Sequence, residues 1–235
     1  MVIVALDFPN KEKTIEFLKK FDCQLWVKVG MELFYGCGPE IIKEIKALGH
    51  NIFLDLKLHD IPNTVKSAMK NLAKLDVDMV NVHAKGGIKM MSEALSAFDG
   101  MSKKPLLIAV TELTSTSDDM LKNELLSSAL MNEMVKQHAN NAKMAGLDGV
   151  VCSPLEVEII KEHCGKDFIT VTPGIRLESN TKDDQVRITT PKDAKKLGTD
   201  YIVVGRPITK AEDPVNTYKL IRKEFLGWEK YQMNY

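Results

Sequence analysis

Eight short runs of apolar and β-branched residues recur along the chain, and they constrain its fold more than any other feature. They occupy residues 2–6, 25–29, 52–56, 79–82, 106–110, 149–152, 168–171 and 201–204. None of them alternates strictly between apolar and polar residues, which is typical of parallel strands that are buried on both faces. The runs therefore predict an α/β fold with a parallel sheet.

The segments between these runs have the apolar period of helices. One predicted face contains Met131, Val135, Ala139 and Ala142, and another contains Ile88, Met91, Leu95 and Phe98. Helix start signals such as Ile61-Pro62 and Asp213-Pro214 agree with this reading. About eight such strand–helix units without a linker predict a single domain over residues 1–235, a (β/α)8 TIM barrel, with an open doubly wound sheet as the alternative. Two long connections, residues 112–128 and 174–189, are predicted to be binding loops or lids.

Charge and cysteine usage narrow the class of function. The chain has 32 Lys and Arg against 32 Asp and Glu, without a basic stripe, so nucleic acid and anionic membrane are not expected partners. Its four cysteines have no zinc-type spacing and are expected to be reduced, as in a cytoplasmic protein. No apolar run reaches membrane-spanning length, and no signal peptide is expected.

A charged cluster lies where the third run ends. Asp55, Lys57 and Asp60 fall within six residues, directly before Pro62. Side chains two apart on a strand point to the same side, so Asp55 and Lys57 are expected to project together. Close carboxylates beside a protonated Lys suit acid/base chemistry, whereas the plainer interpretation is a solvated salt bridge in a loop.

The other predicted strands also end in polar residues. These are Asp7, Lys28, Asn81 with His83, Thr111, Ser153, Thr172, and Gly205 with Arg206. A barrel brings the carboxyl ends of its strands to one face, where barrel enzymes have their active sites. Gly205 and Arg206 follow the last strand, a frequent phosphate position, and Arg176 is expected nearby. His59, His83, Asp55 and Asp60 could bind a divalent metal, but Lys28 and Lys57 would repel it, so no metal is expected.

These residues resemble the orotidine 5′-phosphate decarboxylase family in its short bacterial form. The resemblance rests on the D-x-K-x-x-D motif in residues 55–64, which is DLKLHDIPNT in this chain. It extends to Ala5-Leu6-Asp7, Val27-Lys28-Val29-Gly30, Thr111-Glu112-Leu113-Thr114-Ser115, Thr172-Pro173-Gly174-Ile175-Arg176, Asp184-Gln185 and Val204-Gly205-Arg206-Pro207-Ile208. It thus covers nearly the whole chain in the same order.

The resemblance implies decarboxylation of orotidine 5′-phosphate to uridine 5′-phosphate and carbon dioxide, the last step of de novo UMP biosynthesis, without metal or organic cofactor. Lys57 would protonate C6 of the pyrimidine, Asp55 and Asp60 would flank the reacting carboxylate, and Lys28 would bridge Asp55 and the ribose. The further substrate-binding residues it implies are Asp7, Ile61, Thr64, Thr114, Pro173, Arg176, Gln185, Gly205 and Arg206. It also implies a homodimer in which Asp60 and Thr64 reach the neighbouring active site.

Two other functions remain open at this point. A magnesium-dependent decarboxylase or aldolase acting on a phosphorylated keto sugar resembles this chain and shares D-x-K-x-x-D, but has an acidic residue where Lys28 stands here. A non-catalytic nucleotide-binding protein would not need buried like charges. Activity that survives a chelator would separate the first alternative from the metal-free decarboxylase.

Overall fold

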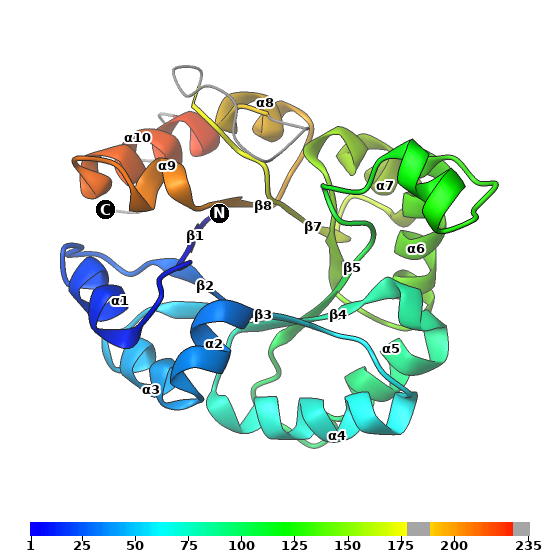
Figure 1. Ribbon diagram of the computed structural model, residues 1–235, viewed down its shortest axis with the longest axis horizontal. Helices are drawn as coiled ribbons and strands as arrows, with labels where there is room; N and C mark the ends of the chain where they lie inside the picture. The colour runs from blue at the N-terminus through cyan, green and yellow to red at the C-terminus, as the bar shows by residue number, and fades with distance from the viewer. Residues whose placement is uncertain (178–188, 228–235) are drawn as a thin grey trace.

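The eight predicted runs form eight parallel strands that close into a barrel in the order β1 to β8. The computed structural model describes residues 1–177 and 189–227, and Figure 1 shows the strands as a ring with helices outside it. The strands are β1 (Val2–Ala5), β2 (Trp26–Gly30), β3 (Asn51–Leu58), β4 (Met79–His83), β5 (Leu106–Val110), β6 (Gly149–Val151), β7 (Ile169–Thr172) and β8 (Tyr201–Val204). The prediction of a barrel is confirmed, and the alternative of an open doubly wound sheet is wrong.

Helices follow the strands and cover the outside of the barrel. The α-helices are α1 (Lys11–Leu18), α2 (Met31–Cys37), α3 (Glu40–Ala47), α4 (Pro62–Leu72), α5 (Gly87–Ser96), α6 (Met131–Met144), α7 (Val157–Cys164), α8 (Pro191–Lys196), α9 (Arg206–Thr209) and α10 (Pro214–Leu226). Short helical turns are η1 (Ala73–Leu75), η2 (Ala84–Gly86), η3 (Met120–Glu124) and η4 (Pro154–Glu156). Pro62 and Pro214 stand at the first position of their helices, where the missing N–H costs no hydrogen bond.

The two predicted apolar helix faces agree with the observed burial to different extents. All four residues of the predicted α6 face are buried. On α5 the prediction is partly wrong, because Ile88 is 37% exposed while Met90 and Ala94 are fully buried. The buried residues of α5 are Met90, Met91 and Ala94, so its buried face is rotated away from Ile88.

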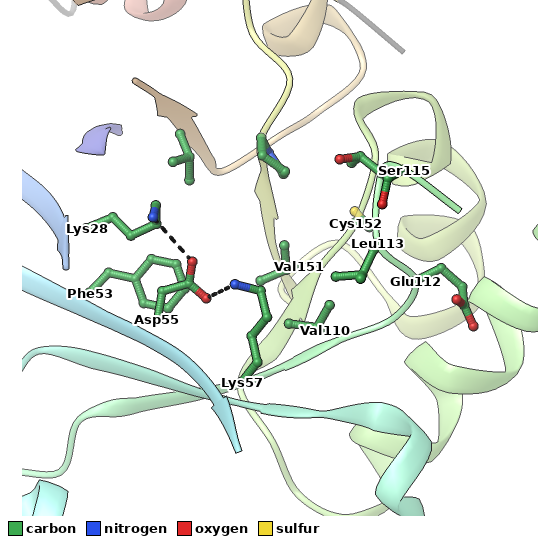
Figure 2. Close-up of a pocket in the computed structure, with 13 residues that line it drawn as sticks. Lys28, Phe53, Asp55, Lys57, Val110, Glu112, Leu113, Ser115, Val151 and Cys152 are labelled. Atoms are coloured by element: carbon green, nitrogen blue, oxygen red, sulfur yellow. Dashed lines mark hydrogen bonds and ion pairs between the residues drawn. The ribbon is translucent and has the colours of Figure 1, made fainter. Parts of the chain in front are cut away.

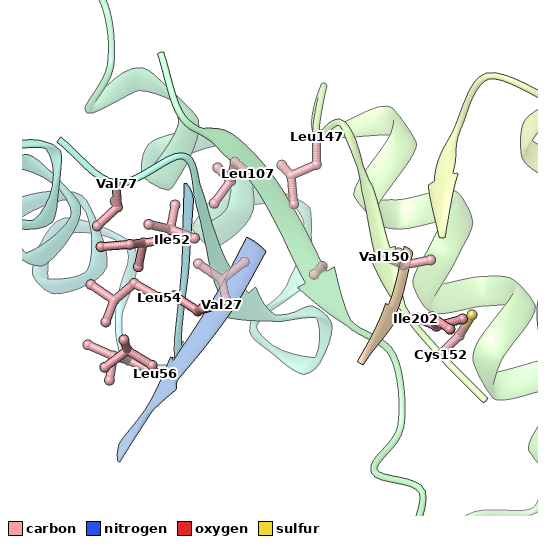
Figure 3. Packing of buried hydrophobic residues seen from close by; sticks show 14 of the residues in the cluster. Val27, Ile52, Leu54, Leu56, Val77, Leu107, Leu147, Val150, Cys152 and Ile202 are labelled. Carbon is pink, nitrogen blue, oxygen red and sulfur yellow. The ribbon is translucent and has the colours of Figure 1, made fainter. Parts of the chain in front are cut away.

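Two apolar layers hold the barrel together. Ile52, Leu54 and Leu56 project from β3 to the same side, in the layer between strands and helices (Figure 3). Phe53, one residue out of phase with them, packs inside the barrel with residues from other strands. This alternation follows from the two-residue period of a strand. It also means that Asp55 and Lys57, in phase with Phe53, belong to the inner face.

The pairing of β3 with β4 is irregular at the end that carries the charges. Leu54 pairs with Val80 and Leu58 with Val82, so β3 has two more residues than β4 over this interval. Lys57 lies within the irregular stretch and has φ of 51°, a left-handed conformation that is rare for residues other than glycine. The strand therefore bulges where it carries Asp55 and Lys57.

The two ends of the long connection after β7 are joined. Ile175 and Thr189 form an isolated parallel bridge, and the N–H of Arg176 donates to the carbonyl of Thr189 over 3.1 Å. The predicted lid, residues 178–185, and the C-terminal tail from residue 228 lie outside the described residues. None of the described helices has the length and apolar character that crossing a membrane requires.

Candidate active site

A cavity of about 230 Å³ opens at the carboxyl ends of the strands, where the sequence predicts the site. Its lining residues come from β2, β3, β5, β6 and β8, and from the loops after β5, β6 and β7. They are Lys28, Phe53, Asp55, Lys57, Val110, Glu112, Leu113, Thr114, Ser115, Val151, Cys152, Pro173 and Val203. The predicted residues Lys28, Asp55, Lys57, Thr114 and Pro173 are thus brought together around one cavity.

One side of the cavity carries a row of three charges. Asp55 lies between Lys28 and Lys57, and both ammonium groups point at its carboxylate (Figure 2). The distance from Lys57 Nζ to Asp55 Oδ1 is 2.7 Å, and that from Lys28 Nζ to Asp55 Oδ2 is 3.5 Å. Lys28 Nζ also donates to Asp7 Oδ1 over 3.1 Å. The structure therefore links residues from β2, β3 and the segment after β1 in one alternating chain of charges.

The Asp55 carboxylate is held in its ionised form. The residue is only 7% exposed, and such burial by itself would raise its pKa. The nearby charges of Lys28 and Lys57, and hydrogen bonds from Lys57 and Asn81, outweigh burial and lower the pKa of Asp55 below its usual value. A fixed negative charge therefore stands beside two ammonium groups at neutral pH.

Apolar side chains make up much of the rest of the cavity lining. Phe53, Val110, Val151 and Val203 belong to it, and Cys152 lies beside them. Burial raises the pKa of the Cys152 thiol well above its usual value, so this sulfur is neutral and behaves as a small apolar group. The cavity can accordingly receive a flat ring with its charged edge toward Lys28, Asp55 and Lys57.

Glycines leave room for the charged groups near the barrel axis. A Cβ on Gly30 would lie 3.0 Å from Lys28 Nζ, and one on Gly205 would lie 3.5 Å from Asp7 Oδ2. Gly205 immediately precedes Arg206, which begins α9 after β8. Both Gly205 and Arg206 are half-buried at this end of the barrel, although neither lines the cavity.

Other predicted residues lie outside the cavity. Asp60, Ile61 and Thr64 are exposed on the segment that leads from β3 into α4, and Asp60 Oδ1 accepts a hydrogen bond from the N–H of Ile61 over 2.6 Å. Arg176 is half-buried and donates to the carbonyl of Ile175. The predicted Gln185 lies outside the described residues.

Glu112 is a cavity residue to which the sequence assigned no role. Its side chain is 2% exposed, and its carboxylate lies 2.9 Å from Lys85 Nζ and 3.5 Å from His138 Nδ1. In Figure 2 this carboxylate points away from the Lys28–Asp55–Lys57 row. The pair with Lys85 joins η2 to the start of the loop after β5, which carries Thr114. Only the tertiary structure brings Lys85, Glu112 and His138 together, so sequence spacing gave no signal.

Asn81 is a second residue whose role the sequence did not assign. It is 1% exposed on β4, and its Nδ2 donates to Asp55 Oδ1 over 2.7 Å. Its Oδ1 accepts from the backbone N–H of Lys57 over 2.8 Å. The sequence signal was its place among the polar residues that end the predicted strands.

The histidines that the sequence left unassigned lie near this network. The rings of His59 and His83 stack with centroids 5.6 Å apart. Burial, followed by the charges of Lys85 and other neighbours, lowers the pKa of His83 to about 4, so it is neutral at physiological pH. Within residues 1–177 and 189–227, no three His, Cys, Asp or Glu side chains are grouped so that they could hold a metal ion.

Comparisons with known proteins agree with one another. The profile of the orotidine 5′-phosphate decarboxylase / HUMPS family matches residues 1–221. Orotidine 5′-phosphate decarboxylase of Bacillus cereus (strain AH820) is 56% identical over 231 residues, which are 96% of this chain and 97% of that protein. The crystal structure of orotidine 5′-phosphate decarboxylase from Lactobacillus acidophilus has a TM-score of 0.85 and 49% identity, covering 95% of this chain and 98% of that one. An uncharacterized conserved protein from Geobacillus kaustophilus has a TM-score of 0.86 and 48% identity, covering 96% of this chain and 100% of that one.

Proposed function

This chain belongs to the orotidine 5′-phosphate decarboxylase / HUMPS family, and from that membership we propose that it converts orotidine 5′-phosphate to uridine 5′-phosphate and carbon dioxide, the last step of de novo UMP biosynthesis. The observation that carries the proposal is the Lys28–Asp55–Lys57 row beside an apolar cavity. A decarboxylase of this kind is a carboxy-lyase, which cleaves a carbon–carbon bond and replaces the lost carboxylate by a proton.

Asp55 and Lys57 have opposite effects on the reacting carboxylate. With the pyrimidine in the cavity and its C6 carboxylate beside Asp55, the two negative charges repel each other. Two unit charges about 4 Å apart at an effective dielectric near 20 interact by up to roughly 4 kcal/mol. That repulsion disappears as carbon dioxide leaves, so the transition state gains relative to the bound substrate.

Lys57 stabilises the charge that develops at C6 and then neutralises it. Its ammonium group is already oriented, because Asp55 Oδ1 accepts from it over 2.7 Å. As the C6–carboxylate bond breaks, the electron pair stays on C6, and the attraction to Lys57 Nζ increases. Lys57 then transfers a proton to C6, giving the product and a neutral amine that is reprotonated from solvent.

Binding of the ribose and phosphate is assigned to the rest of the predicted set. Asp7 and Lys28, joined over 3.1 Å, would bind ribose hydroxyl groups. Gly205 and Arg206, after the last strand, together with Gln185 would hold the phosphate, with Arg176 nearby. Thr114 and Pro173 line the cavity and would contact the pyrimidine. Phosphate binding far from C6 supplies free energy that holds the substrate in its strained position.

The active form is proposed to be a homodimer with shared sites. Asp60, Ile61 and Thr64 do not line the cavity of their own chain, and Ile61 exposes 67% of its surface. Packing of Ile61 against the partner subunit would remove this apolar side chain from water. In such a dimer Asp60 and Thr64 would reach the neighbouring cavity and add a second carboxylate beside the substrate.

We propose no metal or organic cofactor for this reaction. A cation placed at Asp55 would meet the ammonium groups of Lys28 and Lys57, both within 3.5 Å of the carboxylate. The four cysteines are free, which suits the reducing conditions of the cytoplasm, the compartment that we propose.

The test follows the loss of absorbance as orotidine 5′-phosphate becomes uridine 5′-phosphate, with the wild-type protein in excess EDTA. We expect turnover that is the same with and without the chelator. The proposal would be contradicted if the protein did not turn over orotidine 5′-phosphate but acted on a phosphorylated keto sugar once magnesium was added. That result would place the chain with the magnesium-dependent enzymes.

The phosphate role of Arg206 has its own test. Charge-assisted hydrogen bonds contribute about 1.5–3 kcal/mol, so Arg206→Ala should lower kcat/KM by about 10- to 100-fold, with both KM and kcat affected. Lys104→Ala is the control, because Lys104 is a half-exposed cation just before β5, at the opposite end of the barrel. Unchanged kinetic parameters in Arg206→Ala would remove Arg206 from the phosphate site.

A further inference from the structure

The backbone N–H of Lys57 is bound by a side chain and lies in the irregular part of β3. In a regular parallel sheet such N–H groups donate to carbonyls of a neighbouring strand. Here the two extra residues of β3 between Leu54 and Leu58 interrupt the ladder. The N–H of Lys57 instead donates to the side-chain Oδ1 of Asn81 over 2.8 Å. The Asn81 amide therefore takes the place of a strand carbonyl inside the bulge.

The other end of the same amide contacts Asp55. Asn81 Nδ2 donates to Asp55 Oδ1 over 2.7 Å, and Lys57 Nζ donates to the same oxygen over 2.7 Å. Because the amide oxygen is engaged by a donor and the amide nitrogen by an acceptor, only one of the two flipped orientations of Asn81 is compatible with both contacts. Asn81 is 1% exposed and does not line the cavity, so it acts without touching the substrate.

We propose that Asn81 is a positioning residue that fixes the relative placement of Lys57 and Asp55 by binding the backbone of one and the carboxylate of the other. Lys57 adopts a left-handed conformation, φ of 51°, which L-residues rarely hold without support from their surroundings. Asn81 supplies that support from β4. A proton donor must stand within hydrogen-bond reach of the atom that it protonates, and a displacement of about 1 Å can cost about 100-fold in rate.

This inference rests on the proposed decarboxylase function, and its test separates the two. The variants are Asn81→Leu, which has a similar shape and no hydrogen bonds, and Asn81→Asp, which keeps an acceptor for the Lys57 N–H but sets a carboxylate against Asp55. Val82→Ala is the control, because Val82 is a fully buried neighbour on β4 that faces the helix layer. For each protein we would measure kcat and KM for orotidine 5′-phosphate, the Kd of uridine 5′-phosphate, and Tm.

We expect Asn81→Leu to lower kcat by about 100-fold while KM and the Kd of the product change by less than about threefold, because Asn81 orients the reacting groups and does not bind the ligand. Asn81→Asp should lose at least about 30-fold in kcat, since its carboxylate repels Asp55. Val82→Ala should lower Tm and leave kcat within about threefold of wild type.

Two results would overturn the inference while the wild-type protein remains active. One is a kcat within threefold of wild type in Asn81→Leu, or in Asn81→Asp if Asn81→Leu does not fold. The other is a loss of kcat in Val82→Ala equal to that of the Asn81 variants, which would reduce the effect to general destabilisation. An inactive wild-type protein would instead contradict the proposed function itself.

Discussion

Replacing Lys57 by Ala tests the centre of the mechanism. The change removes the ammonium group that lies 2.7 Å from Asp55 Oδ1. A positive charge about 4 Å from a developing carbanion contributes about 4 kcal/mol at an effective dielectric near 20, which corresponds to about 1,000-fold in rate. General acid catalysis adds about 100- to 10,000-fold and overlaps with this term. We therefore expect kcat to fall by at least about 1,000-fold.

The same change should destabilise the fold only moderately. Removing one partner of a buried ion pair costs about 3–5 kcal/mol when the other charge is left alone. Asp55 would keep the ammonium group of Lys28 at 3.5 Å and the hydrogen bond from Asn81 at 2.7 Å. We expect a loss of about 2 kcal/mol, or about 4–8 °C in Tm for a domain of this size.

Lys46 provides a closely matched control at the other end of the barrel. Its Nζ lies 2.9 Å from Asp78 Oδ2, and the two side chains are 21% and 12% exposed, against 27% and 10% for Lys57 and Asp55. Asp78 also keeps other donors when Lys46 is removed, among them the N–H of Ile52. Lys46→Ala should therefore lower Tm by a similar amount and leave kcat unchanged.

The assay is the absorbance decrease of orotidine 5′-phosphate in excess EDTA, with thermal unfolding of each variant measured in the same buffer. Turnover of Lys57→Ala within tenfold of wild type would refute the assignment of Lys57 as proton donor. Equal losses of kcat in Lys57→Ala and Lys46→Ala would also refute it, because stability alone would then explain both.

Further predictions concern the dimer, one histidine and the barrel core. If Asp60 serves the neighbouring site, an equal mixture of Asp60→Ala and Lys57→Ala, refolded together, should regain roughly a quarter of wild-type activity, and no recovery would argue against shared sites. The pKa of His83 is lowered to about 4 in the folded protein, against about 6.5 in the unfolded chain. Between these two pH values the unfolded chain binds the proton more readily, so the free energy of unfolding should fall as pH drops through this range. The fall should be smaller in His83→Gln. A Cβ on Gly149 would lie 2.1 Å from a β7 carbonyl oxygen, whereas one on Gly36 would meet nothing within 4 Å. Gly149→Ala should thus lower the free energy of unfolding by about 3 kcal/mol in urea titration, and Gly36→Ala should not.

Much of the fold follows from local sequence patterns. Parallel strands buried on both faces read as nearly continuous apolar runs. Each of the eight predicted runs overlaps a strand, and its ends differ from those of the strand by at most two residues. Capping residues mark helix starts because their side chains accept hydrogen bonds from the first free N–H groups, as Asp213 Oδ1 does from the N–H of Asn216 over 2.9 Å. Proline marks them because it has no N–H that would be left without a partner there. The face of a helix that is buried depends on tertiary packing, however: in α5 it contains Met90, Met91 and Ala94, whereas the sequence period had placed Ile88 there.

The candidate site was predictable to the extent that it depends on one strand or on the barrel as a whole. Asp55 and Lys57 share a face because they lie two residues apart, and Lys28 meets them because β2 is the neighbour of β3. Glu112 was not predictable, since its partners Lys85 and His138 come from a turn and a helix that only tertiary packing brings near.

The bulge in β3 shows that predicting which face of a strand a residue occupies does not predict the geometry of the site. The period of two predicts that Lys57 points inward, but it also predicts an extended backbone, whereas Lys57 has φ of 51°. That conformation depends on pairing with β4, which lies more than twenty residues later and has two fewer residues over the same interval. Asn81 compensates for the mismatch by a side-chain hydrogen bond, and the same amide contacts Asp55. Sequence identifies the charged groups, but their relative placement involves a contact between two strands, and the proposed mechanism depends on that placement.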